Sequence, residues 1–496
     1  MHFLGIDLGS SSIKLSVLNG DSGEIIASST YPEEELSIQT PQLGWAEQNP
    51  EIWWEIFKTA LGQLTKKGIN LSTIEAIGIA YQMHGLVVLD KDNQVLRPSI
   101  IWCDSRAVDV GDEAFLKLGE EQILPKLLNS PGNFTASKLA WVKQNEPDLF
   151  DRVFKFMLPG DFLAMKLSSE ITTTATGLSE GILWDFESRT LSKDVLDVFG
   201  FCEEMIPELL PAIGSDLTVQ DNVAKELGFK KGVKISYRAG DQPNNAFSLN
   251  VLNPGETAAT AGTSGVIYAV TDKNVYDSKS RINTFLHVNA DENTPRNGVL
   301  ICINGTGILY SWLKKLLNSG GGNINYDQMN AMMDSVKPGA DGLMCLPFGN
   351  GAERIFENRL VGSHFLNLDF NRHTNAHILR AAIEGIIFAM NLGFEMLGEL
   401  DIPQKTIRAG KANLFLSKSF RDIFVQVTGT QLELYDTDGA AGAARGAALG
   451  FGFYATKESA FENLQLIDRI EPELSKQEEY NELYTAWKAT ITNHSF

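Results

Sequence analysis

The chain has 496 residues, of which 43% are apolar and 21% charged, and its 62 acidic and 42 basic side chains give a net charge of −20. A surface this acidic repels nucleic-acid phosphates and anionic lipid headgroups, so neither nucleic acid nor membrane is expected as a partner. The four cysteines show no CxxC spacing, which argues against a zinc site or a disulfide framework and fits a reducing compartment. The sequence shows no signal-peptide pattern and no apolar run of membrane-spanning length, so we expect a cytoplasmic protein. Its length predicts two or three domains.

The first half of the sequence predicts short strands alternating with helices, which is typical of α/β proteins. The expected strands are apolar and bounded by turn residues, at 3–8, 13–18, 24–29, 74–80 and 86–89. The first two are joined by the tight turn Gly9-Ser10-Ser11-Ser12. A helix is predicted to begin at Asn49-Pro50-Glu51, which offers an N-cap, a proline in the first turn and an acidic residue at the positive end of the helix dipole.

The second half begins with the same arrangement as the first. A strand at 234–237 runs into the segment Ala239-Gly240-Asp241-Gln242. Two further strands, 256–261 and 266–270, are joined by the turn Gly262-Thr263-Ser264-Gly265. A strand, a Gly-Ser/Thr turn and another strand therefore occur twice, about half a chain apart.

This repeat predicts two related domains, residues 1–249 and 250–496, each giving one hairpin turn to a shared cleft. Two more helices are expected in the second part. One spans 377–400, where apolar residues recur at helical spacing, and the other is the small-residue segment 438–450, for which a flexible loop is the alternative.

The first cluster of polar residues consists of Asp7, Gly9, Ser10, Ser11 and Lys14. A carboxylate at a strand end can hold a hydrated divalent cation, while the amides and hydroxyls of the next turn face phosphate oxygens. The alternative is an ordinary hairpin in which the aspartate caps the turn. The motif alone favours neither interpretation.

A second turn with the same chemistry is formed by Gly262 and Thr263, with a plain hairpin loop as the alternative. Two such hairpins facing one cleft would suit a bound triphosphate. The sequence contains no GxxxxGK[ST] P-loop. ATP, if it binds, is therefore expected between two hairpins.

Asp241 follows a strand directly, and polar residues come after it. Phosphoryl transfer to an alcohol needs a carboxylate that accepts the hydroxyl proton and a polar neighbour that orients it. The simpler interpretation is a helix N-cap, which is the commoner role of an aspartate in such a position.

Eight segments occur in the order found in the FGGY family of carbohydrate kinases, namely IDLGSSSIK, GWAEQNPEIWW, YQMHG, WCDSR, NFTASKLAWVKQNEP, AGDQPNNA, GETAATAGTSGVIY and RAAIEGIIFAM. They extend from residue 4 to about 390, so the resemblance covers nearly the whole chain. Members of that family have an α/β, actin-like, ribonuclease-H-type fold of two domains, with ATP and sugar meeting in the central cleft. The resemblance implies an ATP-dependent carbohydrate kinase that uses ATP and Mg²⁺. It also implies that residues 1–249 bind the sugar and carry the first phosphate turn, and that residues 250–496 bind the nucleotide and carry the second.

The resemblance also implies roles for single residues. Asp241 would be the general base, and Asp7 together with Asp241 would hold Mg²⁺ through water. The expected nucleotide contacts are Gly9, Ser10, Ser11, Lys14, Gly262, Thr263, Gly307, Gly410 and Asn413. Here the segment 409–415 departs from the glycine-rich adenine motif of the family, which leaves the adenine contacts and the nucleotide preference open.

The loop Gln82-Met83-His84-Gly85 most resembles that of the family's xylulose-phosphorylating members, in which Met and His face the sugar. The expected sugar contacts are Gln82, Met83, His84, Trp102, Asp104, Asp241 and Gln242. The resemblance implies phosphorylation of D-xylulose at its terminal hydroxyl. Because Gln242 stands where Asn is usual, a kinase of ribulose, fructose or a deoxy-ketose is an alternative. An actin-like, nucleotide-gated sensor or assembly protein is another, and a homodimer is left open.

Overall fold

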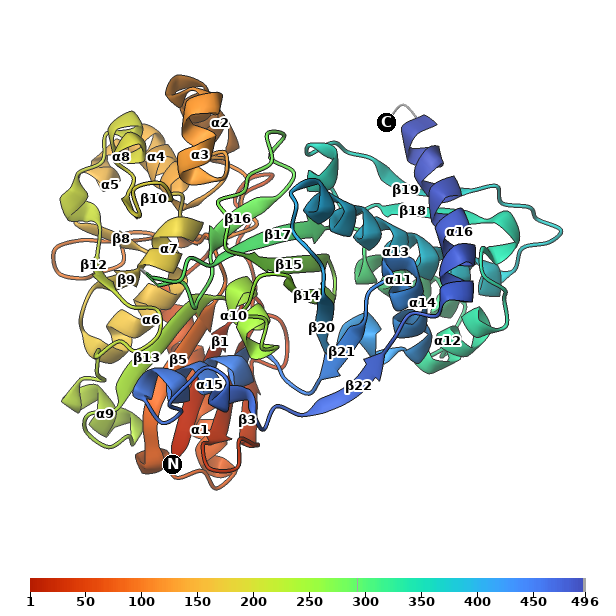
Figure 1. Cartoon of the computed structure of the whole chain (residues 1–496). Coiled ribbons are helices and arrows are strands. Elements are labelled where there is room, and N and C mark those ends of the chain that lie inside the picture. The colour runs from red at the N-terminus through yellow and green to blue at the C-terminus, as the bar shows by residue number, and fades with distance from the viewer. Residues whose placement is uncertain (292, 494–496) are drawn as a thin grey trace.

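In the computed structural model, which describes residues 1–291 and 293–493, the chain forms two large β-sheets with helices packed on them (Figure 1). The first sheet has the strand order β13-β5-β1-β2-β3. Its strands are β1 (His2–Leu8), β2 (Ile13–Asn19), β3 (Ile25–Tyr31), β5 (Ile74–Tyr81) and β13 (Lys234–Gly240). β1 pairs antiparallel with β2 and parallel with β5, and β13 adds parallel to β5. The carboxyl ends of β1, β5 and β13 therefore lie at one edge of this sheet.

The second sheet repeats this arrangement with the order β16-β17-β15-β14-β20-β21-β22. Its strands are β14 (Glu256–Ala261), β15 (Gly265–Thr271), β16 (Asn283–Leu286), β17 (Asn297–Ile303), β20 (Thr406–Gly410), β21 (Leu432–Tyr435) and β22 (Leu466–Ile470). β14 pairs antiparallel with β15 and parallel with β20, as β1 does with β2 and β5. The predicted strands and their repeat are confirmed, whereas the division into residues 1–249 and 250–496 stays a proposal.

The remaining elements cover these sheets and connect them. The helices are α2 (Val108–Leu118), α3 (Glu120–Leu127), α4 (Thr135–Asn145), α5 (Pro147–Phe150), α6 (Pro159–Ser168), α7 (Ala175–Glu180), α8 (Lys193–Phe199), α9 (Asp221–Leu227), α10 (Asp241–Ser248), α11 (Gly307–Asn318), α12 (Tyr326–Asp334), α14 (Lys418–Thr428) and α16 (Leu474–Asn493), besides three described below. The short strands are β4 (Glu47–Gln48), β6 (Val87–Leu89), β7 (Ser99–Ile100), β8 (Lys155–Met157), β9 (Thr172–Thr174), β10 (Trp184–Asp185), β11 (Thr190–Leu191), β12 (Glu208–Leu210), β18 (Met344–Phe348) and β19 (Gly362–Leu366).

Helix α1 (Pro50–Lys66) begins where the sequence predicts. The Asn49 side chain accepts a hydrogen bond from the Glu51 N–H at 3.1 Å, which satisfies one of the free amides of the first turn. Its apolar face buries Trp53 and Phe57 in the core beside β2 and β3. This helix therefore covers the hairpin that carries the first phosphate turn.

Helix α13 (Asn375–Glu399) is the long apolar helix expected at 377–400. By length and composition it could cross a membrane, so the expectation that no such stretch exists is wrong for this segment. However, 78% of the apolar stretch is buried inside the protein, where the helix packs against α12, α14 and β18. Its apolar character is explained by this place in the core of the second half.

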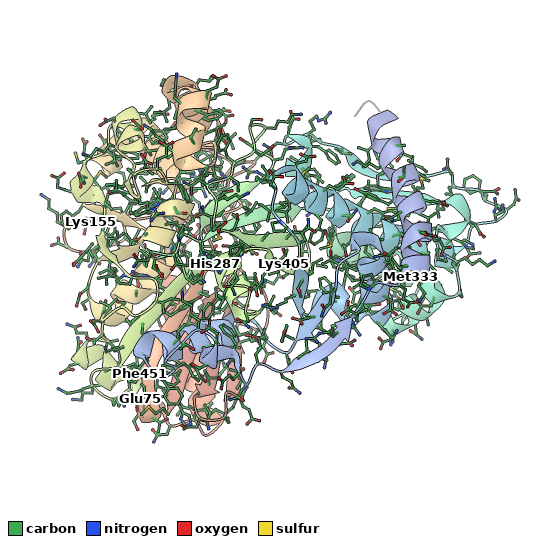
Figure 2. All side chains as sticks on the ribbon, viewed as in Figure 1. Glu75, Lys155, His287, Met333, Lys405 and Phe451 are labelled. Carbon is green, nitrogen blue, oxygen red and sulfur yellow. The ribbon has the colours of Figure 1, made fainter. Side chains whose placement is uncertain are left out.

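The small-residue segment forms helix α15 (Gly439–Phe451), so the helical interpretation is confirmed. Although it comes late in the chain, α15 packs on β1, β5 and β13 of the first sheet, and Figure 1 shows this blue helix against the red and orange strands. A Cβ on Gly5 or on Gly78 would overlap backbone atoms of α15, so glycines in the strands and alanines in the helix permit this approach. Phe451, labelled in Figure 2, is the last residue of the helix over this sheet.

Candidate active site

Asp7 lies near the end of β1 and faces the N-terminus of α15. A Cβ on Gly439, the first residue of that helix, would overlap the Asp7 carboxylate. The preceding residue, Asp438, caps the helix by accepting the Ala441 N–H at 2.9 Å and also forms an ion pair with Lys14. The predicted first cluster is therefore completed by a helix end from the other half of the chain.

The turn after Asp7 is held in place by its own neighbours. The Gly9 N–H donates to the Ser12 carbonyl at 3.0 Å, and Gln48 Nε2 donates to the Ser10 carbonyl at 2.6 Å. The Ser11 side chain is exposed and that of Ser10 is half-buried. The turn is thus fixed, while Ser10 and Ser11 keep some exposure; their contacts with phosphate stay a prediction.

Asp241 is the first residue of α10 and follows β13 without a break. The helix is capped by Gly240 rather than by Asp241, so the simple N-cap interpretation does not describe the structure. Gln242 Nε2 donates a hydrogen bond to Asp241 Oδ2 at 3.4 Å. Burial and the negative charge of Asp7 raise the pKa of Asp241 to about 7, while the hydrogen bonds from Gln242 lower it. A carboxylate with this pKa suits a general base near neutral pH.

Asp7 and Asp241 form a pair of like charges. Burial and the Asp438 carboxylate raise the pKa of Asp7 to about 6, against the effect of Lys14. Among the described residues, no group of three or more His, Cys, Asp or Glu side chains gathers to hold a metal alone. This donor set fits Mg²⁺, which is usually bound by one or two carboxylates together with substrate phosphates.

The second predicted turn meets the N-terminus of α11. The Gly307 N–H donates to the Gly262 carbonyl at 2.8 Å, and the Ile308 N–H donates to the Thr263 carbonyl at 3.2 Å. A Cβ on Gly307 would overlap that Gly262 carbonyl, so only glycine fits there. The Thr263 side chain is exposed beside the helix end. The arrangement offers a hydroxyl next to a helix N-terminus, which favours anions.

The two tentative adenine residues lie close to this turn. Gly410 ends β20, which pairs with β14, the strand that leads into the turn. Asn413 begins the 3₁₀ helix Asn413–Leu416, and its Nδ2 is 3.3 Å from where a Cβ on Gly262 would lie. The structure therefore brings the residues predicted in the second half for nucleotide binding to one edge of the second sheet.

The loop at residues 82–85 follows β5 at the same sheet edge as Asp7. The Gln82 N–H donates to the Leu8 carbonyl at 2.8 Å, and its buried side chain is hydrogen-bonded to Gln48 Oε1 at 3.4 Å. Met83 Cγ is 2.6 Å from where a Cβ on Gly240 would lie, directly before Asp241. Gln82 thus fixes the loop, and Met83 places its thioether beside the candidate base.

His84 adopts a left-handed conformation with φ of 60°, which residues other than glycine enter rarely. Its Nδ1 lies 2.8 Å from the Glu180 carbonyl, and the ring packs against Phe134 and Phe285 at centroid distances of 4.8 and 5.3 Å. Burial and the positive charge of Lys138 lower the pKa of His84 to about 3. The ring is therefore neutral, and with Nδ1–H donating to the carbonyl, Nε2 is left as its hydrogen-bond acceptor.

Trp102 and Asp104 take different positions. Trp102 is 53% exposed and donates from Nε1 to Ser10 Oγ at 3.3 Å, next to the first phosphate turn. Asp104 is fully buried, where it accepts the Ala46 N–H at 2.6 Å and pairs with Arg106 at 2.7 Å. Asp104 thus pairs with Arg106 in its own loop and with the backbone of a distant segment at Ala46, so its described contacts differ from the expected sugar contact.

Four residues near the site were not among the predicted contacts. Asp438 and Gly439 complete the pocket of Asp7, and Gln48 joins the first phosphate turn to Gln82. The fourth is Glu180, whose pKa is raised well above its ordinary value by burial and by the charges of Asp241 and Asp161. The sequence could have pointed to Asp438, because an aspartate before a run of small residues is typical of a helix N-cap. No sequence pattern points to Glu180.

Comparison with known proteins shows which family has this sequence. Residues 2–248 match the model of the N-terminal domain of the FGGY family of carbohydrate kinases. The chain belongs to the FGGY family. The xylulose kinase of Escherichia coli (strain K12) is 29% identical over 452 residues, covering 90% of this chain and 88% of that protein.

Solved structures give the fold of the whole FGGY chain. The xylulose kinase from Rhodospirillum rubrum has a TM-score of 0.88 at 24% identity and covers 99% of both chains. Plasmodium falciparum glycerol kinase with ADP also reaches 0.88, at 19% identity, covering 100% of this chain and 98% of that one. The chain therefore has the two-domain, actin-like fold of these kinases.

The exposed Thr263 hydroxyl leads to a prediction about nucleotide binding. Thr263→Val should raise the KM for ATP by about threefold to tenfold, because a hydrogen bond to phosphate is lost while the shape is nearly kept. The KM for the sugar should change less. Initial rates at varied ATP and varied sugar would measure both, and a change confined to the sugar KM would contradict the assignment.

Proposed function

We propose that this FGGY kinase transfers the γ-phosphoryl group of Mg-ATP to the terminal hydroxyl of D-xylulose, giving D-xylulose 5-phosphate and ADP. The observation that carries this proposal is the position of Met83 and His84. Both lie at the sheet edge that also carries Asp241, and Met83 packs against Gly240, the residue before Asp241. A thioether and a neutral imidazole acceptor beside a base suit a short polyol chain.

In this proposal Asp241 accepts the proton of the terminal hydroxyl as the oxygen attacks the γ-phosphorus in line with the leaving ADP oxygen. Gln242 orients the carboxylate. The pKa of Asp241, about 7, keeps a large share of this carboxyl group unprotonated at neutral pH. The Gly9–Ser12 turn and the Gly262–Gly265 turn contact the phosphates from two sides.

Asp7 and Asp241 would hold Mg²⁺ through water. When bound, the ion supplies positive charge that offsets the negative charge of the phosphates. Lys14 stays paired with Asp438 and keeps the N-terminus of α15 beside Asp7. The domains at residues 1–249 and 250–496, and a location in the cytoplasm, belong to this proposal as well.

A panel of acceptors tests the substrate. With excess Mg-ATP, D-xylulose should give the highest kcat/KM among D-xylulose, D-ribulose, L-ribulose, D-fructose, glycerol and gluconate, measured by coupled ADP release. His84→Ala should lower the D-xylulose value and leave ATP hydrolysis without sugar nearly unchanged, because only the sugar uses the ring. A tenfold preference for another ketose would overturn the xylulose assignment. If no acceptor accelerated ADP release, the actin-like sensor or assembly protein would become the better account.

A further inference from the structure

Glu180 is the last residue of α7 and contacts residues of the predicted acceptor site. Its backbone carbonyl lies 2.8 Å from Nδ1 of His84. Its carboxylate lies over Gly240, since a Cβ there would overlap Glu180 Oε2 as well as approach Met83. Glu180 therefore borders the elements that carry His84, Met83 and Asp241.

The carboxylate of Glu180 is incompletely paired. The residue is 2% exposed, and Oε1 has no hydrogen-bond partner of good geometry among the residues that the structure describes. The nearest side-chain donor to the carboxyl group is the buried Tyr81 hydroxyl, which lacks a well-aligned partner as well. Arg238, a buried cation of the neighbouring strand β13, lies 3.3 Å from Asp161 and donates to Thr172 at 3.1 Å instead. A buried polar atom without a partner costs free energy, which a ligand hydroxyl at this place would recover. Oε1 therefore has capacity for a hydrogen bond that a polar ligand could form.

We propose that Glu180 is a specificity-determining residue of the acceptor site, where Oε1 forms a hydrogen bond with a secondary hydroxyl of the bound sugar. This inference rests on the proposed function and deepens it, because it names a residue that distinguishes one ketose from its epimers. The contacted hydroxyl differs from the terminal one that faces Asp241. An epimer that directs this hydroxyl elsewhere leaves the buried oxygen unpaired and is rejected for that reason.

The test compares selectivity rather than activity alone. The kcat/KM values for D-xylulose, D-ribulose (its C3 epimer) and L-ribulose (its C4 epimer) are measured for wild type, Glu180→Ala and Glu180→Gln. Glu180→Ala should reduce the preference for D-xylulose over at least one epimer by about tenfold, the loss of a hydrogen bond that involves a carboxyl group. The KM for ATP and the sugar-independent ATP hydrolysis should stay within about twofold.

Glu180→Gln keeps the size and one oxygen, so it should lose only part of the preference, about threefold. If Glu180→Ala does not fold, this variant decides, and a preference equal to that of wild type would overturn the proposal. The matched control is Glu384→Gln, another buried acid, which pairs with Arg380 at 2.6 Å within α13. It should leave the selectivity unchanged.

Two other results would also overturn the role of Glu180. One is an unchanged epimer preference in a folded Glu180→Ala enzyme. The other is a fall of ATP hydrolysis and unfolding midpoint in parallel with sugar turnover, which would indicate a purely structural residue. A wild-type enzyme that accepts no sugar would overturn the proposed function as well, so failure of the two ideas is distinguishable.

Discussion

Asp241→Asn should lower kcat by a factor of about 10²–10⁴, the usual contribution of a general base. The amide is nearly isosteric but cannot take the proton of the attacking hydroxyl. Because the loss falls on the transition state, sugar and ATP should bind with little change. Steady-state kinetics together with calorimetric binding of both ligands would measure this, and near-normal turnover by a folded variant would remove Asp241 from its role.

The same group should govern the pH dependence of the wild-type enzyme. Burial and Asp7 raise the pKa of Asp241 to about 7. A base works only when unprotonated, so kcat/KM should be high above this pH and decline as the pH falls through it. Asp241→Asn should lack this acidic limb, which provides a second measurement independent of the size of the rate loss.

Gly5→Ala should lower the free energy of unfolding by about 3 kcal/mol or more. This is the upper end of the usual cost of adding a methyl group to a well-packed core. The new Cβ would overlap the Ala440 carbonyl oxygen and lie close to the Ala444 nitrogen, and backbone atoms cannot turn aside as a side chain can. Helix α15 would have to move off the first sheet. Because its first turn carries Asp438 and Gly439 beside Asp7, kcat should fall together with the unfolding midpoint.

Gly62→Ala is the matched control for this substitution. Gly62 is exposed within α1, and a Cβ there would have no neighbour within 4 Å. The change should be neutral or stabilise the helix by up to about 1 kcal/mol, because alanine restricts the unfolded chain and favours helix. Thermal unfolding of both variants would give the comparison. Equal stability of Gly5→Ala and wild type would contradict the packing described for α15.

Much of the fold follows from local sequence. The hairpin strands were predictable because glycine and hydroxyl residues in the Gly9–Ser12 and Gly262–Gly265 turns separate apolar runs, and the cap at Asn49 fixed the start of α1. The parallel pairing of β1, β5 and β13 then brings Asp7, the 82–85 loop and Asp241 to one edge. Their chemical roles came from the family resemblance and remain proposals.

What could not be predicted depends on contacts between distant segments. The alanines of α15 indicate close packing but not the partner, which turned out to be Gly5 and Gly78 of the first sheet. Asp104 has the residue type of a sugar ligand, yet its nearest donors are Ala46 and Arg106, so its charge is used inside the protein. Residue type alone does not reveal such partners.

The central claim is that one phosphoryl group passes from ATP to the terminal hydroxyl of the sugar. The most direct measurement is ³¹P and ¹³C NMR of the product formed from D-xylulose and Mg-ATP by the full-length enzyme. We expect a phosphate ester at C5, formed in amounts equal to the ADP released. Phosphate on another carbon, or inorganic phosphate as the only phosphorus product besides ADP, would contradict the account.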